Sequence, residues 1–313
     1  MAMLGQALSQ TGQTQLSETR PIQSQPTPSQ PTPSQQRQAR LRPFERAPRP
    51  MVGYAVDYPD GHSTGRHSHP RAQLLFATAG VMRIATDRAL FVIPAGTGLW
   101  VPADAQHEVR MDGPVAMRAL FLRTDAAAAG PGDTTVIAVS PLLRELILTV
   151  CNEPVVWDAR GPIRLVAALA LHEIGRAAAR PLSLPACRDP RLRRVADALF
   201  ADPADPRDLD AHAEAAGASV RTLTRLFRSE TGMSFQQWRR QLRMIEALAL
   251  LGRGEPPARV AAKVGFASVP AFGAAFRETF GTTPSAMTPR RPVDSDVVSL
   301  YAVPPPALDR GQP

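Results

Sequence analysis

The C-terminal third of the chain contains one helix–turn pattern twice. The copies read DLDAHAEAAGASVRTLTRLFRSETG, residues 208–232, and PPARVAAKVGFASVPAFGAAFRETFG, residues 256–281. In each copy an Ala-rich segment ends at a glycine (Gly217, Gly265), and a serine follows within three residues (Ser219, Ser268). Glycine tolerates the left-handed backbone of a tight turn, and serine accepts a hydrogen bond from an amide of the following helix. The pattern predicts two helix-turn-helix units, whose second helices enter the major groove of DNA.

A third helix is predicted between the two units. Ser234 and Gln237 form a capping-box pattern, and helical periodicity continues to about Leu251. One apolar stripe recurs along it: Phe235, Trp238, Leu242, Ile245, Leu248 and Ala249. About 18 residues rising about 1.5 Å each make a rod of roughly 27 Å. With packing at both ends, this rod would hold two recognition helices about 34 Å apart, which is one turn of DNA.

Residues 189–287 resemble the DNA-binding domain of the AraC/XylS family of bacterial transcription regulators. The motifs that carry the resemblance are AGASVRTLTRLFRSETGMSFQQWRRQLR and VGFASVPAFGAAFRETFGTTP, at the family's spacing. The resemblance implies binding to operator sites in double-stranded DNA. The matching recognition positions are Arg221, Thr222, Thr224 and Arg225, then Val269, Pro270, Ala271 and Ala274. Four further residues complete the expected DNA-contacting set: Arg228, Arg239, Ser268 and Arg277.

The two recognition helices differ in chemistry. Arg221 and Arg225 lie four apart on one helical face, and arginine can donate two hydrogen bonds to guanine, although phosphate contact is the alternative. Val269, Ala271 and Ala274 have no side-chain hydrogen-bonding groups, so the second helix is expected to act through positioning and DNA shape. Between residues 219 and 245 six arginines stand against one acid, and the whole chain carries a net charge of +8. Such a basic stripe is the expected footprint of a polyanion partner.

Residues 50–125 alternate short apolar runs with Gly, Pro and Asp breaks every eight to twelve residues. This spacing is typical of an all-β barrel or sandwich. A spaced set within it resembles both motifs of the cupin family of small barrels: Gly61, His67, His69, Gln73 and Gly80, then Gly96, Pro102 and His107. Two positions depart from the family pattern, because Gln73 stands in place of the usual Glu and Asp104 in place of Gly. The resemblance implies a sensor barrel with an internal pocket.

Histidines in this set suggest a site for a metal or a ligand. His67 and His69 are two apart and would point to the same side of a strand, with His107 arriving from a neighbouring strand. Three imidazoles and the oxygen of Gln73 suit a divalent transition metal with one open position. Gln73 is a neutral and weaker ligand than a carboxylate. The alternative is a polar barrel interior that hydrogen-bonds a small effector without a metal.

The remaining segments complete an α+β multidomain layout. Residues 126–180 show two apolar helical stripes that suggest a homodimer interface, with packing on the chain's own barrel as the alternative. Residues 180–190 are predicted to be a linker. Residues 1–49 and 288–313, rich in Pro or in Gln and Ser, are predicted to be disordered tails. No signal peptide and no run long enough to span a membrane is recognised, so a cytoplasmic protein is expected.

The pattern as a whole predicts a transcription regulator and not an enzyme. A cupin-like sensor for a small molecule or a metal would control two helix-turn-helix units, with RNA polymerase as a candidate further partner. The main alternative is a metal-dependent enzyme tethered to a DNA-binding domain. The three histidines permit it, but no dedicated acid or base is evident beside them. A second alternative is a ligand-independent architectural DNA binder with a degenerate barrel.

Overall fold

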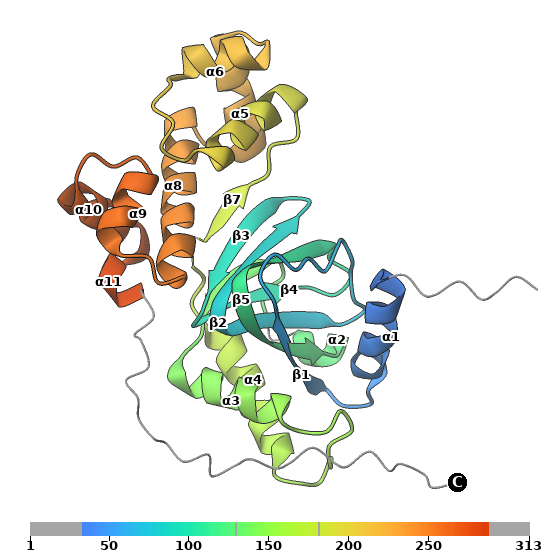
Figure 1. The fold of residues 1–313 in the computed structure, drawn as a ribbon. Coiled ribbons are helices and arrows are strands. Elements are labelled where there is room, and N and C mark those ends of the chain that lie inside the picture. Colours follow the sequence, from blue (N-terminus) through green and yellow to red (C-terminus); the bar gives the residue numbers. More distant parts are fainter. Residues whose placement is uncertain (1–32, 129, 181, 288–313) are drawn as a thin grey trace, which may run out of the picture.

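The computed structural model describes residues 33–128, 130–180 and 182–287 of the 313-residue chain. A sheet-rich N-terminal part lies against a helical C-terminal part, and the long helix α8 (Phe235–Gly252) forms most of the contact (Figure 1). None of the helices in these described ranges is long and apolar enough to cross a membrane. The predicted tails at 1–32 and 288–313 lie outside the described residues.

The N-terminal part is built on one sheet of antiparallel strands. The strands are β1 (Met51–Tyr58), β2 (Ala72–Thr86), β3 (Ala89–Pro94), β4 (Thr97–Val101), β5 (His107–Leu122), β6 (Thr135–Ala138) and β7 (Ser183–Pro185). Their order is β1-β5-β2-β3-β7, with β4 paired to β2 and β6. The long pair β2–β5 carries bulges near Ala79, which bend the sheet. The sheet-rich domain is as predicted, but the sheet does not close into the expected cupin-like barrel, because the end strands β1 and β7 do not pair among the described strands.

Helices surround this sheet on more than one side. They are α1 (Pro33–Arg46), α2 (Thr124–Ala127), α3 (Pro141–Cys151) and α4 (Ile163–Arg176). Ser140 caps α3 by accepting a hydrogen bond from the amide of Leu143. The apolar stripes of α3 and α4 pack against Leu74 and Leu120 of the sheet, on the side away from the C-terminal helices (Figure 1). The buried residues of these stripes thus pack in the chain's own core, which was the predicted alternative to dimerisation.

Two segments that were predicted to be a disordered tail and a linker contain a helix and a strand. Within residues 1–49, α1 buries Leu41 and packs the ring of Phe44 against Tyr54, with 4.9 Å between ring centroids. The prediction of disorder over 33–49 is wrong, because a few apolar residues at helical spacing pack on the sheet. Local composition does not reveal that such a surface is present. The predicted linker at 180–190 contains β7, which pairs with β3 through Leu184 and Leu90.

The C-terminal part is entirely helical. Its remaining elements are α5 (Pro190–Ala201), α6 (Leu209–Ala216), α7 (Val220–Leu226), η1 (Phe227–Thr231), α9 (Pro257–Lys263), α10 (Val269–Phe280) and α11 (Pro284–Met287). Two short pairs, α6–α7 and α9–α10, flank α8 (Figure 1). The capping box of Ser234 and Gln237 is present, and the whole predicted stripe of α8 is buried. The π-helical turn η1, which extends α7, was not predicted from the sequence.

Candidate functional site

Both helix pairs are joined by the turn that the sequence predicts. Gly217 ends α6 at φ +66°, and Ser219 accepts a hydrogen bond of 3.2 Å from the amide of Thr222 at the start of α7. Gly265 follows α9 at φ +74°, and Ser268 caps α10. A side chain at Gly265 would also come within 2.9 Å of the backbone of Ala204, so this glycine is required by space as well as by conformation.

Helix α7 presents a polar outer face. Leu223 and Leu226 are buried, whereas Arg221, Thr224 and Arg225 of α7 and Arg228 of the following turn η1 are exposed. Thr222 is half-buried, and its hydroxyl lies 2.9 Å from that of Ser219, so it helps to hold the start of the helix. The four exposed side chains give this face three guanidinium groups and one hydroxyl for contact with DNA bases or phosphates.

Helix α10 presents a nearly apolar outer face. Phe272, Ala275 and Phe276 are buried. The exposed positions are Val269, Pro270, Ala271 and Ala274, followed by Arg277 and Glu278 near the end of the helix. Pro270 lies in the first turn, where the missing amide costs no intrahelical hydrogen bond. Phe280 is half-buried and packs against the core. Direct base readout through hydrogen bonds has few donors here besides Arg277, as the sequence indicated.

Arg239, another predicted DNA contact, is engaged within the protein. Its guanidinium donates to the carbonyl of Arg207 at 2.8 Å and to Oε1 of Gln236 at 2.9 Å. It also lies over the ring of Phe235, 4.9 Å from the centroid. These contacts make Arg239 a structural link between α8 and the loop before α6.

His212 belongs to the core of the first helix pair. The side chain is 1% exposed, with Nε2 at 3.7 Å from Oδ2 of Asp205. Burial lowers the pKa of His212 despite that neighbour, and the Asp205 carboxyl, hydrogen-bonded by Arg207, has its pKa lowered to about 2. His212 is therefore a core residue whose burial disfavours the protonated form.

The three histidines of the cupin-like motifs come together beneath α1. His67 and His107 exchange backbone hydrogen bonds of 2.9 and 2.8 Å, and nitrogen atoms of His67, His69 and His107 lie within 4.8 Å of one another. His67 and His69 lie in the irregular segment before β2 and not on a strand, which corrects the predicted placement. Asp104, where the cupin motif has glycine, adopts φ +61°, a conformation that Asp tolerates better than most residues.

Each of these rings has an oxygen acceptor at Nδ1. His67 Nδ1 lies 2.8 Å from the carbonyl of Gly65, and His107 Nδ1 lies 2.9 Å from that of Ala105. His69 Nδ1 lies 2.7 Å from Oε1 of Glu45 on α1. An acceptor at Nδ1 holds the proton there, so all three neutral rings share the tautomer whose lone pair is on Nε2. A role for Glu45 in this site could not be predicted from the sequence, because Glu45 lies in the segment predicted to be disordered and no motif marks it.

The space between these side chains is small. A cavity of about 20 Å³ is bordered by the three histidines, Gln73 and Phe121, with Leu41 of α1 among its other neighbours. Gln73 is 4% exposed, and its Oε1 accepts no hydrogen bond from the residues that the structure describes. A volume near that of one water molecule holds an ion or a water and excludes a larger organic molecule while α1 is in place. Three imidazoles and an amide oxygen fit a divalent transition metal.

The sensor sheet docks on α8 through a network of four charges. Arg83 of β2 donates to both carboxylate oxygens of Glu246, at 2.5 and 2.8 Å, and to Asp112 at 2.9 Å. Asp112 also pairs with Arg253 at the end of α8. Burial alone would lower the pKa of Arg83, but the hydrogen bonds and charges of Glu246 and Asp112 outweigh it and raise the pKa above its ordinary value. Nothing in the sequence marks these residues as partners.

Comparison with known proteins connects both parts to regulators. Residues 50–218 match the family described as AraC-like ligand binding domain, and residues 212–290 match a family described as helix-turn-helix domain. The HTH-type transcriptional regulator NimR of Escherichia coli is 31% identical over 218 residues, covering 70% of this chain and 80% of NimR. RipA of Corynebacterium glutamicum is 31% identical over 221 residues, covering 69% of this chain and 62% of RipA. A structure of ToxT from Vibrio cholerae overlaps 76% of this chain and 97% of its own, at 10% identity and a TM-score of 0.33.

Proposed function

We propose a division of function between the two parts of this chain, which belongs to the AraC-like family of HTH-type transcriptional regulators and has a ligand-binding domain before a helix-turn-helix domain. It is a DNA-binding regulator that senses a small ligand. In our proposal residues 189–287 read the operator through two helix-turn-helix units, and residues 50–125 hold the effector site. Residues 126–180 carry the contact between copies.

The first unit supplies the base-specific contacts in this proposal. Arg221 and Arg225 lie on the exposed face of α7, and bidentate donation to guanine is the commonest specific arginine contact. The second unit would position the protein through the start of α10 and Arg277. The observation that carries the proposal is the pair of serine-capped helices, each with its apolar face buried and its other face exposed.

The effector site is proposed to be the histidine cluster with Gln73. The shared tautomer and the short distances between nitrogen atoms support a divalent transition metal held by His67, His69 and His107. When bound, such an ion supplies positive charge and an open position for an oxygen donor of an effector. Glu45 holds His69 in orientation from outside the ligand set and provides the negative charge that Gln73 lacks.

A second copy of the chain is the proposed partner of α3 and α4. Leu142, Leu165 and Leu169 are 47%, 58% and 41% exposed although they belong to the helices whose other faces pack on the sheet. Replacing both Leu165 and Leu169 by Glu should convert a dimer into a monomer in light scattering, with Arg164→Glu as the exposed control. If the parent protein is a monomer in light scattering, the proposed contact between copies is refuted.

Operator selection tests the central proposal. Random duplexes enriched by the full chain should share one sequence in which the two recognition helices face one side of the duplex. Selection is then repeated with metal-stripped protein and with protein loaded with Zn, Mn, Ni, Cu or Fe. No enrichment refutes sequence-specific binding. Enrichment that is unaffected by any metal and by His69→Ala refutes the effector site alone. Substrate turnover that is lost in His69→Ala would favour the rival of a DNA-tethered enzyme.

A further inference from the structure

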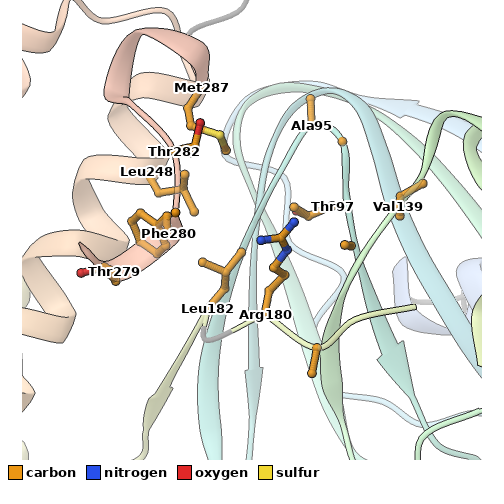
Figure 2. Close-up of a pocket in the computed structure, with 14 residues that line it drawn as sticks. Ala95, Thr97, Val139, Arg180, Leu182, Leu248, Thr279, Phe280, Thr282 and Met287 are labelled. Carbon is orange, nitrogen blue, oxygen red and sulfur yellow. The ribbon is translucent and has the colours of Figure 1, made fainter. Parts of the chain in front are cut away.

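A second and larger cavity lies between the sheet-rich part and the C-terminal helices (Figure 2). Its volume is about 630 Å³, within the range of roughly 300–1,000 Å³ that is usual for small-molecule sites. One wall includes Val139, Arg180 and Leu182 from the sheet side, and the other includes Leu248, Phe280 and Met287 from α8, α10 and α11. None of the residues around the histidine cluster borders it.

The cavity is lined mainly by apolar side chains, and one of the lining residues is positively charged. Leu182 and Leu248 are buried, and Val139, Phe280 and Met287 are half-buried around the cavity. Arg180 is the charged residue among those that line it, and Figure 2 shows its side chain extending into the space between the two walls. Among the described residues no carboxylate forms an ion pair with Arg180; its backbone amide, by contrast, is fixed to the carbonyl of Val136 at 2.8 Å.

We propose that this cavity is a second effector site, for a small organic carboxylate with an apolar body. The planar guanidinium of Arg180 matches a carboxylate through two parallel hydrogen bonds, and the carbon walls cover an alkyl or aromatic body. A phosphate dianion normally requires more donors than one guanidinium, and a cation would meet Arg180 unfavourably. A neutral apolar molecule would form no ion pair with the exposed guanidinium of Arg180.

Occupancy of this site favours the docked arrangement of the two parts. A ligand there contacts Val139 and Arg180 from the sheet side together with Phe280, which is the last residue of α10. A ligand that binds only when both walls are present stabilises the docked state by RT ln(1 + [L]/Kd), where [L] is its free concentration and Kd its dissociation constant. The second helix-turn-helix unit would then respond to a metabolite without participation of the histidines. This site is additional to the one proposed above and does not depend on it.

Calorimetric titration of the full chain tests the proposal with three matched probes. They are 4-butylbenzoate, 4-butylbenzyl alcohol and 4-butylbenzylamine, and octanoate serves as a second carboxylate of different shape. We expect at least one carboxylate to bind, with the alcohol and the amine at least tenfold weaker. Because hydrogen bonds to charged groups contribute about 1.5–3 kcal/mol, Arg180→Gln should weaken carboxylate binding about tenfold to hundredfold.

Three variants locate the binding. Arg176→Gln removes another exposed arginine at the end of α4 and should leave affinity unchanged. Thr282→Trp fills the helical side of the cavity and should abolish binding, while its far-ultraviolet circular dichroism and melting temperature report whether it folds. His69→Ala should bind the carboxylate as the parent does. Failure of both carboxylates at millimolar concentration, parental affinity in Arg180→Gln, parental affinity in folded Thr282→Trp, or loss of binding in His69→Ala would each overturn the proposal.

Discussion

Breaking the ion pair between Arg83 and Glu246 should weaken the docking of the sensor on α8. The two residues are 163 positions apart and join β2 to α8 by two hydrogen bonds of 2.5 and 2.8 Å. Their side chains are 23% and 11% exposed, so water screens the pair only in part. Replacement of Glu246 by Met keeps the volume and removes the charge, which leaves Arg83 with Asp112 as its acidic partner.

The size of the effect follows from this geometry. Removal of one member of a fully buried pair costs about 3–5 kcal/mol, because the other charge stays buried without its partner. Arg83 retains Asp112 and some exposure, so we expect a loss of about 2–3 kcal/mol in the free energy of unfolding for Glu246→Met. The double variant with Arg83→Met should lose little more, which corresponds to a coupling energy of about 2 kcal/mol.

Urea unfolding of the parent, both single variants and the double variant measures this coupling. Arg240 and Glu278 provide the matched control, since they also join α8 to another element but are 50% and 70% exposed. For an exposed pair the coupling should stay below about 0.5 kcal/mol. Equal coupling in the two cycles, or additive losses for Arg83 and Glu246, would refute the conclusion that this partly buried pair holds the two parts together.

Further variants test other elements. Phe276→Ala should cost about 3–5 kcal/mol of unfolding free energy by leaving a cavity at a fully buried ring; a parental urea midpoint would show that the assigned face of α10 is wrong. Arg225→Ala should weaken operator binding by about 1–3 kcal/mol and relax preference at one position in a binding-site selection, whereas a uniform loss across sequences would identify a phosphate contact. Glu45→Gln should lower metal affinity about 10- to 100-fold in competition with a chelating dye, with Glu173→Gln on α4 as the control; unchanged affinity would exclude Glu45 from positioning His69. Gly265→Ala should destabilise the protein more than Gly217→Ala in thermal melts, since both have positive φ but an added methyl group at Gly265 alone meets backbone, at Ala204; equal losses would contradict the reported close approach.

The helical elements of the DNA-binding part could be predicted because their signals are local. A glycine with positive φ, a serine cap and an apolar residue at every third or fourth position all act within one or two helical turns. The sequence thus located α6, α7, α8, α9 and α10, and the buried face of α8 with Phe235 and Trp238. Spacing likewise brought His67, His69 and His107 into one cluster, because the cupin-like motifs encode a pairing of neighbouring segments.

The tertiary structure alone decided the rest, where residues far apart in the chain depend on each other. Nothing near Glu45 indicates that α1 packs over the histidines, since its helix is stabilised by Tyr54 and Phe121 on a sheet that forms later in the chain. The open sheet, the strand β7 in an expected linker and the pair of Arg83 with Glu246 have the same origin. Local propensity specifies which elements form, whereas burial against distant partners determines where their charged and apolar faces meet.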